Sequence, residues 1–158
     1  MMIFDSFLIF FASMLPLVEL RLGMIFGYLY FDLPILYAAI SATLGNLIAV
    51  LIFYHYLPQI EKYLERFPRF KKYITKIFAK THKEHSKKFI YWGEFFLVMF
   101  IALPIPGSGG WSGAILAFLF DLPRKEAFKF LTLGVIVAGF VMSFLVKNTD
   151  LAISSFLK

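Results

Sequence analysis

The sequence predicts an all-α integral membrane protein made of two copies of one unit, and three observations support this prediction. The string FDLP at 31–34, followed by TLG at 43–45, recurs at 120–123 and 132–134 with every residue displaced by 89 positions. Hydrophobic residues make up 60% of the 158, and the mean hydropathy is +0.78, both above the range of soluble domains. Each copy also contains an interrupted apolar stretch. Because many transporters place a site between two such units, transport is the leading expectation.

Two apolar stretches have the length of one bilayer span, and two are longer and interrupted near the middle. Residues 34–57 and 127–146 are close to the roughly 20 residues that cross a bilayer as a helix. Residues 6–31 and 89–120 contain prolines, which break a helix because they lack an amide donor. The expected breakers are Pro16, Pro104 and Pro106. Each limb of about 9–14 residues reaches only about half-way across, so both stretches are expected to form re-entrant helical hairpins.

The charge distribution predicts which side of the membrane each end faces. Residues 58–88 hold ten Lys or Arg against three Glu, which indicates the cytoplasm by the positive-inside rule. The basic cluster at 124–129 shares that side if residues 89–120 form a hairpin rather than a span. One helix then crosses after each hairpin, so the two copies form an inverted repeat. The expected organisation is a single multi-pass domain of the cell membrane, 1–158, with repeat one at 1–57, a linker at 58–88 and repeat two at 89–158.

The linker is expected to be an amphipathic helix in its own right. Its apolar residues recur at steps of one, three or four positions: Ile60, Tyr63, Leu64, Phe67, Phe70, Ile74, Ile77 and Phe78. A basic helix with such a stripe is expected to lie at the membrane interface and bind anionic lipid headgroups. A solvated linker that only satisfies the positive-inside rule is the alternative.

Glu19 and Arg21 are the charged residues well inside the first apolar stretch, at the expected tip of the first hairpin. Charges near mid-bilayer are costly, so they usually face the protein interior and mark a substrate or ion pathway. Arg21 would lie at the start of the returning half-helix, whose free amides already favour an anion. Glu19 could hold a proton or a cation, or neutralise Arg21. The alternative is an internal ion pair that only pins the hairpin.

The second expected tip is rich in glycine. Its candidate binding residues are Gly107, Ser108, Gly109, Gly110, Trp111 and Ser112. Successive unhindered amides before a helix start form a concavity that suits phosphate or carboxylate, and the hydroxyl and indole groups add donors. The alternative is a tight turn whose glycines allow close helix packing.

Two further polar residues lie within the apolar stretches. Glu94, in the first limb of the second hairpin, is a candidate for a proton path or for a side chain that snorkels to the interface. Asn46 follows Gly45 in the first spanning segment and is expected to form an interhelical hydrogen bond.

Several other classes of protein are not expected. The absence of Cys excludes disulfides, thiolate metal sites and a cysteine nucleophile. The residues assemble no nucleophile, base and oxyanion site, so neither an enzyme nor a cofactor is expected. His82, Glu84 and His85 have no further ligands nearby, so no metal is expected either. The basic linker lacks a nucleic-acid-binding fold around it, which makes lipid the simpler partner, and a homodimer is left open.

Residues 16–23 (PLVELRLG) and 104–113 (PIPGSGGWSG) resemble the small multidrug export protein family, over nearly the whole chain. The resemblance implies a membrane protein that exports small toxic compounds. The chain also resembles, more distantly, the DedA membrane proteins. That superfamily has two facing re-entrant hairpins, and some members are implicated in moving polyprenyl phosphate or other lipids. DedA-like proteins typically place arginine in the second hairpin region, whereas Arg21 lies in the first.

The expected function is a transporter or lipid translocase whose two hairpin tips meet at mid-membrane. A small or lipid-linked anionic substrate is favoured, because Arg21 and the amide-rich turn both select negative charge. An exporter of cationic compounds is the first alternative, and a channel or a non-transporting membrane scaffold are the others.

Overall fold

The computed structural model describes residues 2–64, 87–105 and 107–156, and these residues form helices and short connections. The helices are α1 (Met2–Ser13), α2 (Glu19–Ile25) with a π-helical turn η1 (Phe26–Tyr30), α3 (Ile35–Leu64), α5 (Lys87–Ala102), α6 (Gly110–Leu119) and α7 (Arg124–Phe156). Within this part of the chain the structure has no strand. The all-α prediction is therefore confirmed.

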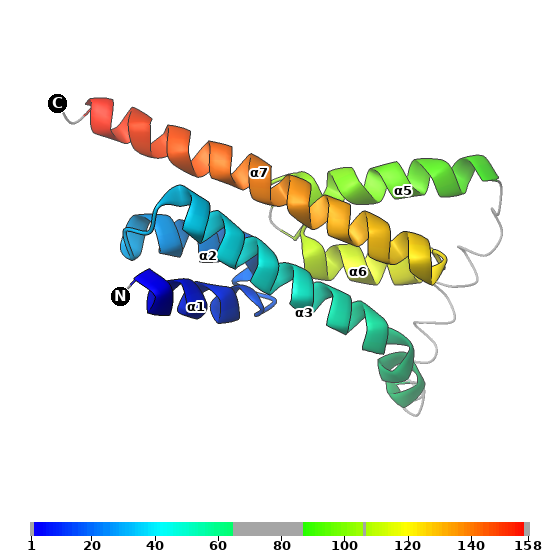
Figure 1. Cartoon of the computed structure of the whole chain (residues 1–158). Helices are drawn as coiled ribbons and strands as arrows, with labels where there is room; N and C mark the ends of the chain where they lie inside the picture. The colour runs from blue at the N-terminus through cyan, green and yellow to red at the C-terminus, as the bar shows by residue number, and fades with distance from the viewer. Residues whose placement is uncertain (1, 65–86, 106, 157–158) are drawn as a thin grey trace.

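The same order of elements occurs twice, as two short helices followed by a long one. Helix α2 folds back along α1 before α3 begins, and α6 folds back along α5 before α7 begins (Figure 1). The long helices α3 and α7 cross at the middle of the molecule, where they pack on each other. The connections at 14–18 and at 103–105 and 107–109 lie near this crossing and face one another (Figure 1). The two helix breaks, although more than 80 residues apart in the sequence, are thus brought together.

Helices α3 and α7 are each long and apolar enough to cross a bilayer, over Ile35–Tyr63 and Arg124–Thr149. Both present large apolar side chains outward, as at Ile48 on α3 and at Phe140, which is 73% exposed, on α7. Such continuous exposed apolar surface is typical of a lipid-facing wall. The shorter helices α1 and α6, of 12 and 10 residues, are equally apolar but too short to span. These features agree with a membrane protein.

The repeated FDLP string forms the same turn in both copies. Asp32 and Asp121 each adopt a left-handed backbone with φ of 51°, a conformation that Asp tolerates better than most residues. The following leucine amide then reaches back to the preceding helix, from Leu33 to the Gly27 carbonyl and from Leu122 to the Ala117 carbonyl. Both leucine side chains are buried. The string therefore turns the chain from the second short helix into the long one.

The glycine of each TLG string lets a long helix approach the first short helix of its own copy. A Cβ at Gly45 on α3 would overlap the backbone carbonyl of Phe10 on α1. A Cβ at Gly134 on α7 would lie 2.9 Å from the Ile101 side chain on α5. The repeated sequence thus marks equivalent contacts as well as equivalent turns.

Three helices extend beyond the apolar stretches that predicted them. Helix α3 continues past 57 to Leu64, with Pro58 inside it. An interior proline removes one backbone hydrogen bond and its ring clashes with the preceding turn, which either breaks a helix or only kinks it, and here the helix continues. Helix α7 runs over Arg124–Phe156 rather than 127–146, and α5 already includes Lys87. The rest of the expected linker helix, 65–86, lies outside the described residues.

We predict that Gly45→Ala lowers thermal stability, because the new methyl group meets a backbone carbonyl that cannot rotate away. A cost of about 1–3 kcal/mol is typical of such overpacking. Gly93→Ala in α5 is the matched control, since no atom lies within 4 Å of a Cβ there and alanine favours a helix by about 1 kcal/mol. Thermal unfolding in detergent measures both variants. Equal melting temperatures for the two would show that the close approach of α1 and α3 is not required.

Candidate functional site

Arg21 reaches from α2 to the opposite helix break. Its Nη1 donates to the Ile105 carbonyl at 2.7 Å, and its Nη2 lies within hydrogen-bond distance of three acceptors. These are the carbonyls of Leu103 (2.6 Å) and Ile101 (3.3 Å) and the hydroxyl of Ser108 (2.9 Å). The last carbonyls of a helix have no partner within it and form the negative end of its dipole. Arg21 therefore caps the C-terminal end of α5.

Glu19 contacts the start of α6, where it accepts a hydrogen bond from the backbone instead of donating one. Its Oε1 accepts a hydrogen bond from the Trp111 amide at 3.3 Å. The carboxylate lies against Gly109, where a Cβ would overlap it and where φ is 147°, a conformation suited to glycine. A carboxylate at a helix N-terminus is stabilised by the free amides and by the positive end of the dipole. Glu19 therefore caps α6 from the other copy of the repeat.

The two charged residues are not paired directly with each other. Among the described residues, the ion pair within 4.0 Å joins Lys129 and Glu126 on α7. Glu19 and Arg21 instead each contact the backbone of the opposite break. The amide-rich turn, which we expected to bind a substrate anion, thus already faces a carboxylate of the chain itself.

An open cleft of about 630 Å³ lies where the two breaks meet. It is lined by Pro16, Leu17, Val18, Glu19, Arg21, Leu22, Ile25, Pro104, Gly107, Ser108, Trp111, Ser112 and Met142. Glu19 and Arg21 are the ionisable groups among these, and the remaining walls are largely apolar. The side chain of Leu17 lies at the edge of this cleft and is 89% exposed.

Most of the site residues expected from the sequence are brought together here, and a few are not. Gly109 and Gly110 are buried behind the cleft rather than lining it. Pro106 lies outside the described residues. Glu94 does not line the cleft. It lies on α5, near the charged side chains of Glu126 and Lys129 on α7.

Buried polar groups lie directly beneath the cleft. Asn46 is fully buried, and its Nδ2 donates to the Ser13 carbonyl at the end of α1 at 3.4 Å, which is the expected interhelical hydrogen bond. Its Oδ1 lies beside Gly110 and has no partner among the described residues. Sequence reasoning missed Ser13, because a serine in an apolar stretch carries no signal of its own. Asn46 therefore bonds to the end of α1 and lies beside the start of α6.

Trp111 lines the cleft and packs on α3. Its ring packs against Phe53 of α3 with the centroids 4.5 Å apart. Its indole Nε1 is buried and has no hydrogen-bond partner among the described residues. Because a buried tryptophan normally pairs this donor, Nε1 is an unsatisfied polar group next to the cleft.

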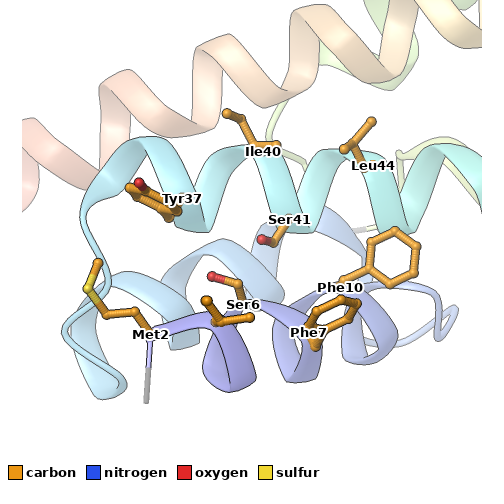
Figure 2. A pocket seen from close by; sticks show the side chains of 9 residues that line it. Met2, Ser6, Phe7, Phe10, Tyr37, Ile40, Ser41 and Leu44 are labelled. Carbon is orange, nitrogen blue, oxygen red and sulfur yellow. The ribbon is translucent and has the colours of Figure 1, made fainter.

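A second, separate pocket of about 360 Å³ lies between α1 and α3 (Figure 2). Apolar side chains line most of it, including Phe7, Phe10 and Ile40, and Ser6 and Ser41 also line it, between the two helices (Figure 2). It shares no lining residue with the cleft. This pocket contains no charged group and offers only apolar contact and hydroxyl groups.

We predict that Arg21→Ala destabilises the protein by about 1–3 kcal/mol, because the Ile101 carbonyl loses its side-chain donor and the carbonyls of Leu103 and Ile105 each lose one of their donors. Arg21→Lys should lose less, since it keeps the charge but not the planar fork. Lys125→Ala, which removes an exposed cation at the start of α7, is the control and should change stability by less than about 0.5 kcal/mol. Melting temperatures in detergent compare the three. An Arg21→Ala protein as stable as the control would contradict the capping role.

Comparison with known proteins places the chain in a family. A family model described as "Putative small multi-drug export protein" matches residues 19–141, more than three quarters of the chain. No curated protein and no solved structure matches it. The matched range begins directly after the first helix break, and it contains the second break, most of the residues that line the cleft and most of the two long apolar helices. The chain therefore belongs to the small multi-drug export protein family, and it is a membrane protein.

Proposed function

We propose that this chain exports small lipophilic cations and that it binds them in the cleft between the two helix breaks. The observation that supports this most is the unequal engagement of the two charged groups in the cleft. Arg21 has four hydrogen-bond acceptors on the opposite break, at 2.6–3.3 Å. Glu19 has one hydrogen bond among the described residues, a long one of 3.3 Å. The carboxylate is therefore the group with capacity left for a ligand.

A carboxylate has two oxygens that together accept about four hydrogen bonds. A single weak donor leaves most of that capacity unused. In a cleft with apolar walls, an under-paired charge is costly and attracts a partner of opposite sign. A cationic substrate would supply that partner.

The walls of the cleft fit a compound that is apolar as well as charged. Leu22, Ile25 and Met142 offer aliphatic contact. Trp111 also lines the cleft, and aromatic rings attract cations. The family description, which names multi-drug export, agrees with a small lipophilic compound.

An anionic or lipid-linked substrate, which the sequence favoured, is less well supported. The Trp111 amide and the space at Gly109 are both taken by the Glu19 carboxylate. The guanidinium of Arg21 already faces four acceptors. An anion would have to displace one of these internal partners before it could bind.

The proposal places α3 and α7 across the cell membrane and the two short-helix pairs in it as re-entrant hairpins, so that the two copies form an inverted repeat. Helices α1 and α6 are about 18 and 15 Å long at about 1.5 Å per residue, or roughly half of the 30 Å hydrocarbon core. Both pairs fold back toward the end from which they came (Figure 1). The basic residues of 58–88 would then lie in the cytoplasm, against anionic lipid headgroups.

A binding experiment with tetraphenylphosphonium as the probe cation tests the proposed substrate class. We expect Glu19→Gln to weaken binding to the purified protein about 10–100-fold, because the neutral amide cannot balance the cation. Glu126→Gln, which neutralises an acidic residue on α7 outside the cleft, is the matched control and should bind like the unmodified chain.

Two results would overturn the cation proposal. One is tetraphenylphosphonium binding that is absent or equal in Glu19→Gln and the control. The other is competition by a polyprenyl phosphate that depends on Arg21 and not on Glu19, which would return the substrate to the anionic class. Export itself is measured as probe movement in proteoliposomes.

The proposed topology predicts that a single cysteine at position 124 reacts with a membrane-impermeant thiol reagent only from the cytoplasmic side. The chain contains no Cys, so one introduced cysteine reports without background. Position 124 is exposed at the start of α7. Labelling from the outside alone would mean that residues 89–120 cross the bilayer, and the hairpin would be wrong.

A further inference from the structure

Glu19 combines three features that are unusual for a residue held only for structural reasons. Its backbone is left-handed, with φ of 49°, which is unfavourable for a glutamate. Its carboxylate is secured among the described residues by one 3.3 Å hydrogen bond. It also lines the open cleft rather than lying sealed in the core. Strained residues of this kind concentrate at functional sites, where the strain accompanies a change of partner.

The position of the Glu19 carboxylate depends on Gly109, which has no side chain in the space that the carboxylate occupies. Gly109 has φ of 147°, and a Cβ there would overlap the Glu19 carboxylate. The first amides of α6 favour a negative charge at this point. The carboxylate is therefore held by a weak electrostatic contact with the start of α6. A cationic ligand could take the place of this contact as the partner of the carboxylate.

Glu19 is also the one cleft group that can gain or lose a proton in ordinary conditions. Arg21, the charged neighbour on the same helix, stays protonated at any physiological pH. The groups that face Glu19 from the opposite break are the Trp111 amide and the hydroxyls of Ser108 and Ser112, and Met142 faces the cleft from α7. None of these titrates in the physiological range.

We propose that Glu19 exchanges a proton for the cationic substrate, so that export is coupled to proton movement in the opposite direction. This inference rests on the proposed function, because it assigns both ligands to the same carboxylate. The protonated carboxyl gives its proton to water as the cation binds, and the carboxylate takes up a proton from water as the cation leaves. One proton is exchanged for each monovalent cation, so the site changes its ligand without a change of net charge. Two positive ligands cannot share one carboxylate, and this exclusion provides the coupling.

Calorimetric binding of tetraphenylphosphonium to the unmodified protein, between pH 5 and pH 9, tests the exchange. Repeating the titrations in buffers of different ionisation enthalpy counts the protons released. We expect affinity to fall about tenfold per pH unit on the acid side, with close to one proton released per cation bound in that range. Glu126→Gln should reproduce this behaviour. Glu19→Gln should retain only weak binding that neither depends on pH nor releases a proton.

The possible failures can be told apart. Binding that depends on Glu19 but has the same affinity at every pH and releases no proton would overturn the exchange and leave the proposed function intact. Absence of binding at every pH would overturn the proposed function and the exchange with it. In proteoliposomes with an acidic interior, the exchange predicts that the probe cation accumulates inside and that accumulation stops when the pH gradient is collapsed.

Discussion

The structure depends on how the groups at two helix ends find hydrogen-bond partners beside an open, largely apolar cleft. Helix α5 stops at Ala102 and α6 starts at Gly110, which leaves carbonyls and amides without partners inside their own helices. Where water is scarce, each such group must find another partner or the break is not tolerated. Arg21 supplies donors to the carbonyls and Glu19 supplies an acceptor to the amides. The glycines near these two side chains, and the close crossing of α3 and α7, allow the side chains to reach the opposite helix ends.

The two copies of the repeat share their scaffold but divide the chemistry. Both use the same left-handed aspartate turn and the same kind of glycine contact. Only the first copy carries charges at its break, and only the second carries the glycine-rich turn that receives them. Asn46 follows the same division, because the equivalent position 89 residues later is Val135. The two sides of the cleft therefore differ in their polar residues, although the helices that carry them are arranged in the same way.

Much of the fold could be predicted from the sequence, because it follows from local patterns. Apolar stretches of spanning length predict α3 and α7, and family membership follows from the residues around the two breaks. The end of α3 could not be predicted from Pro58, since an interior proline breaks some helices and only kinks others. The partners of Glu19 and Arg21 lie 80 to 92 positions away, and a spacing of two residues says nothing about contacts at that range. Ser13 was missed for the same reason, since its contacts exist only once α1 and α3 are packed.

The division of charges between the copies has a consequence for how such a protein could arise. If a single unit had formed this architecture by pairing with an identical unit, each break would have needed both the charged residues and the glycine turn. Once joined in one chain, each unit could lose what its neighbour supplied, and neither could then work with a copy of itself. Glu19 and Gly109 have become complementary in this sense, since the carboxylate fills the space where the glycine lacks a side chain. In the present chain the two breaks are therefore complementary to each other and not interchangeable.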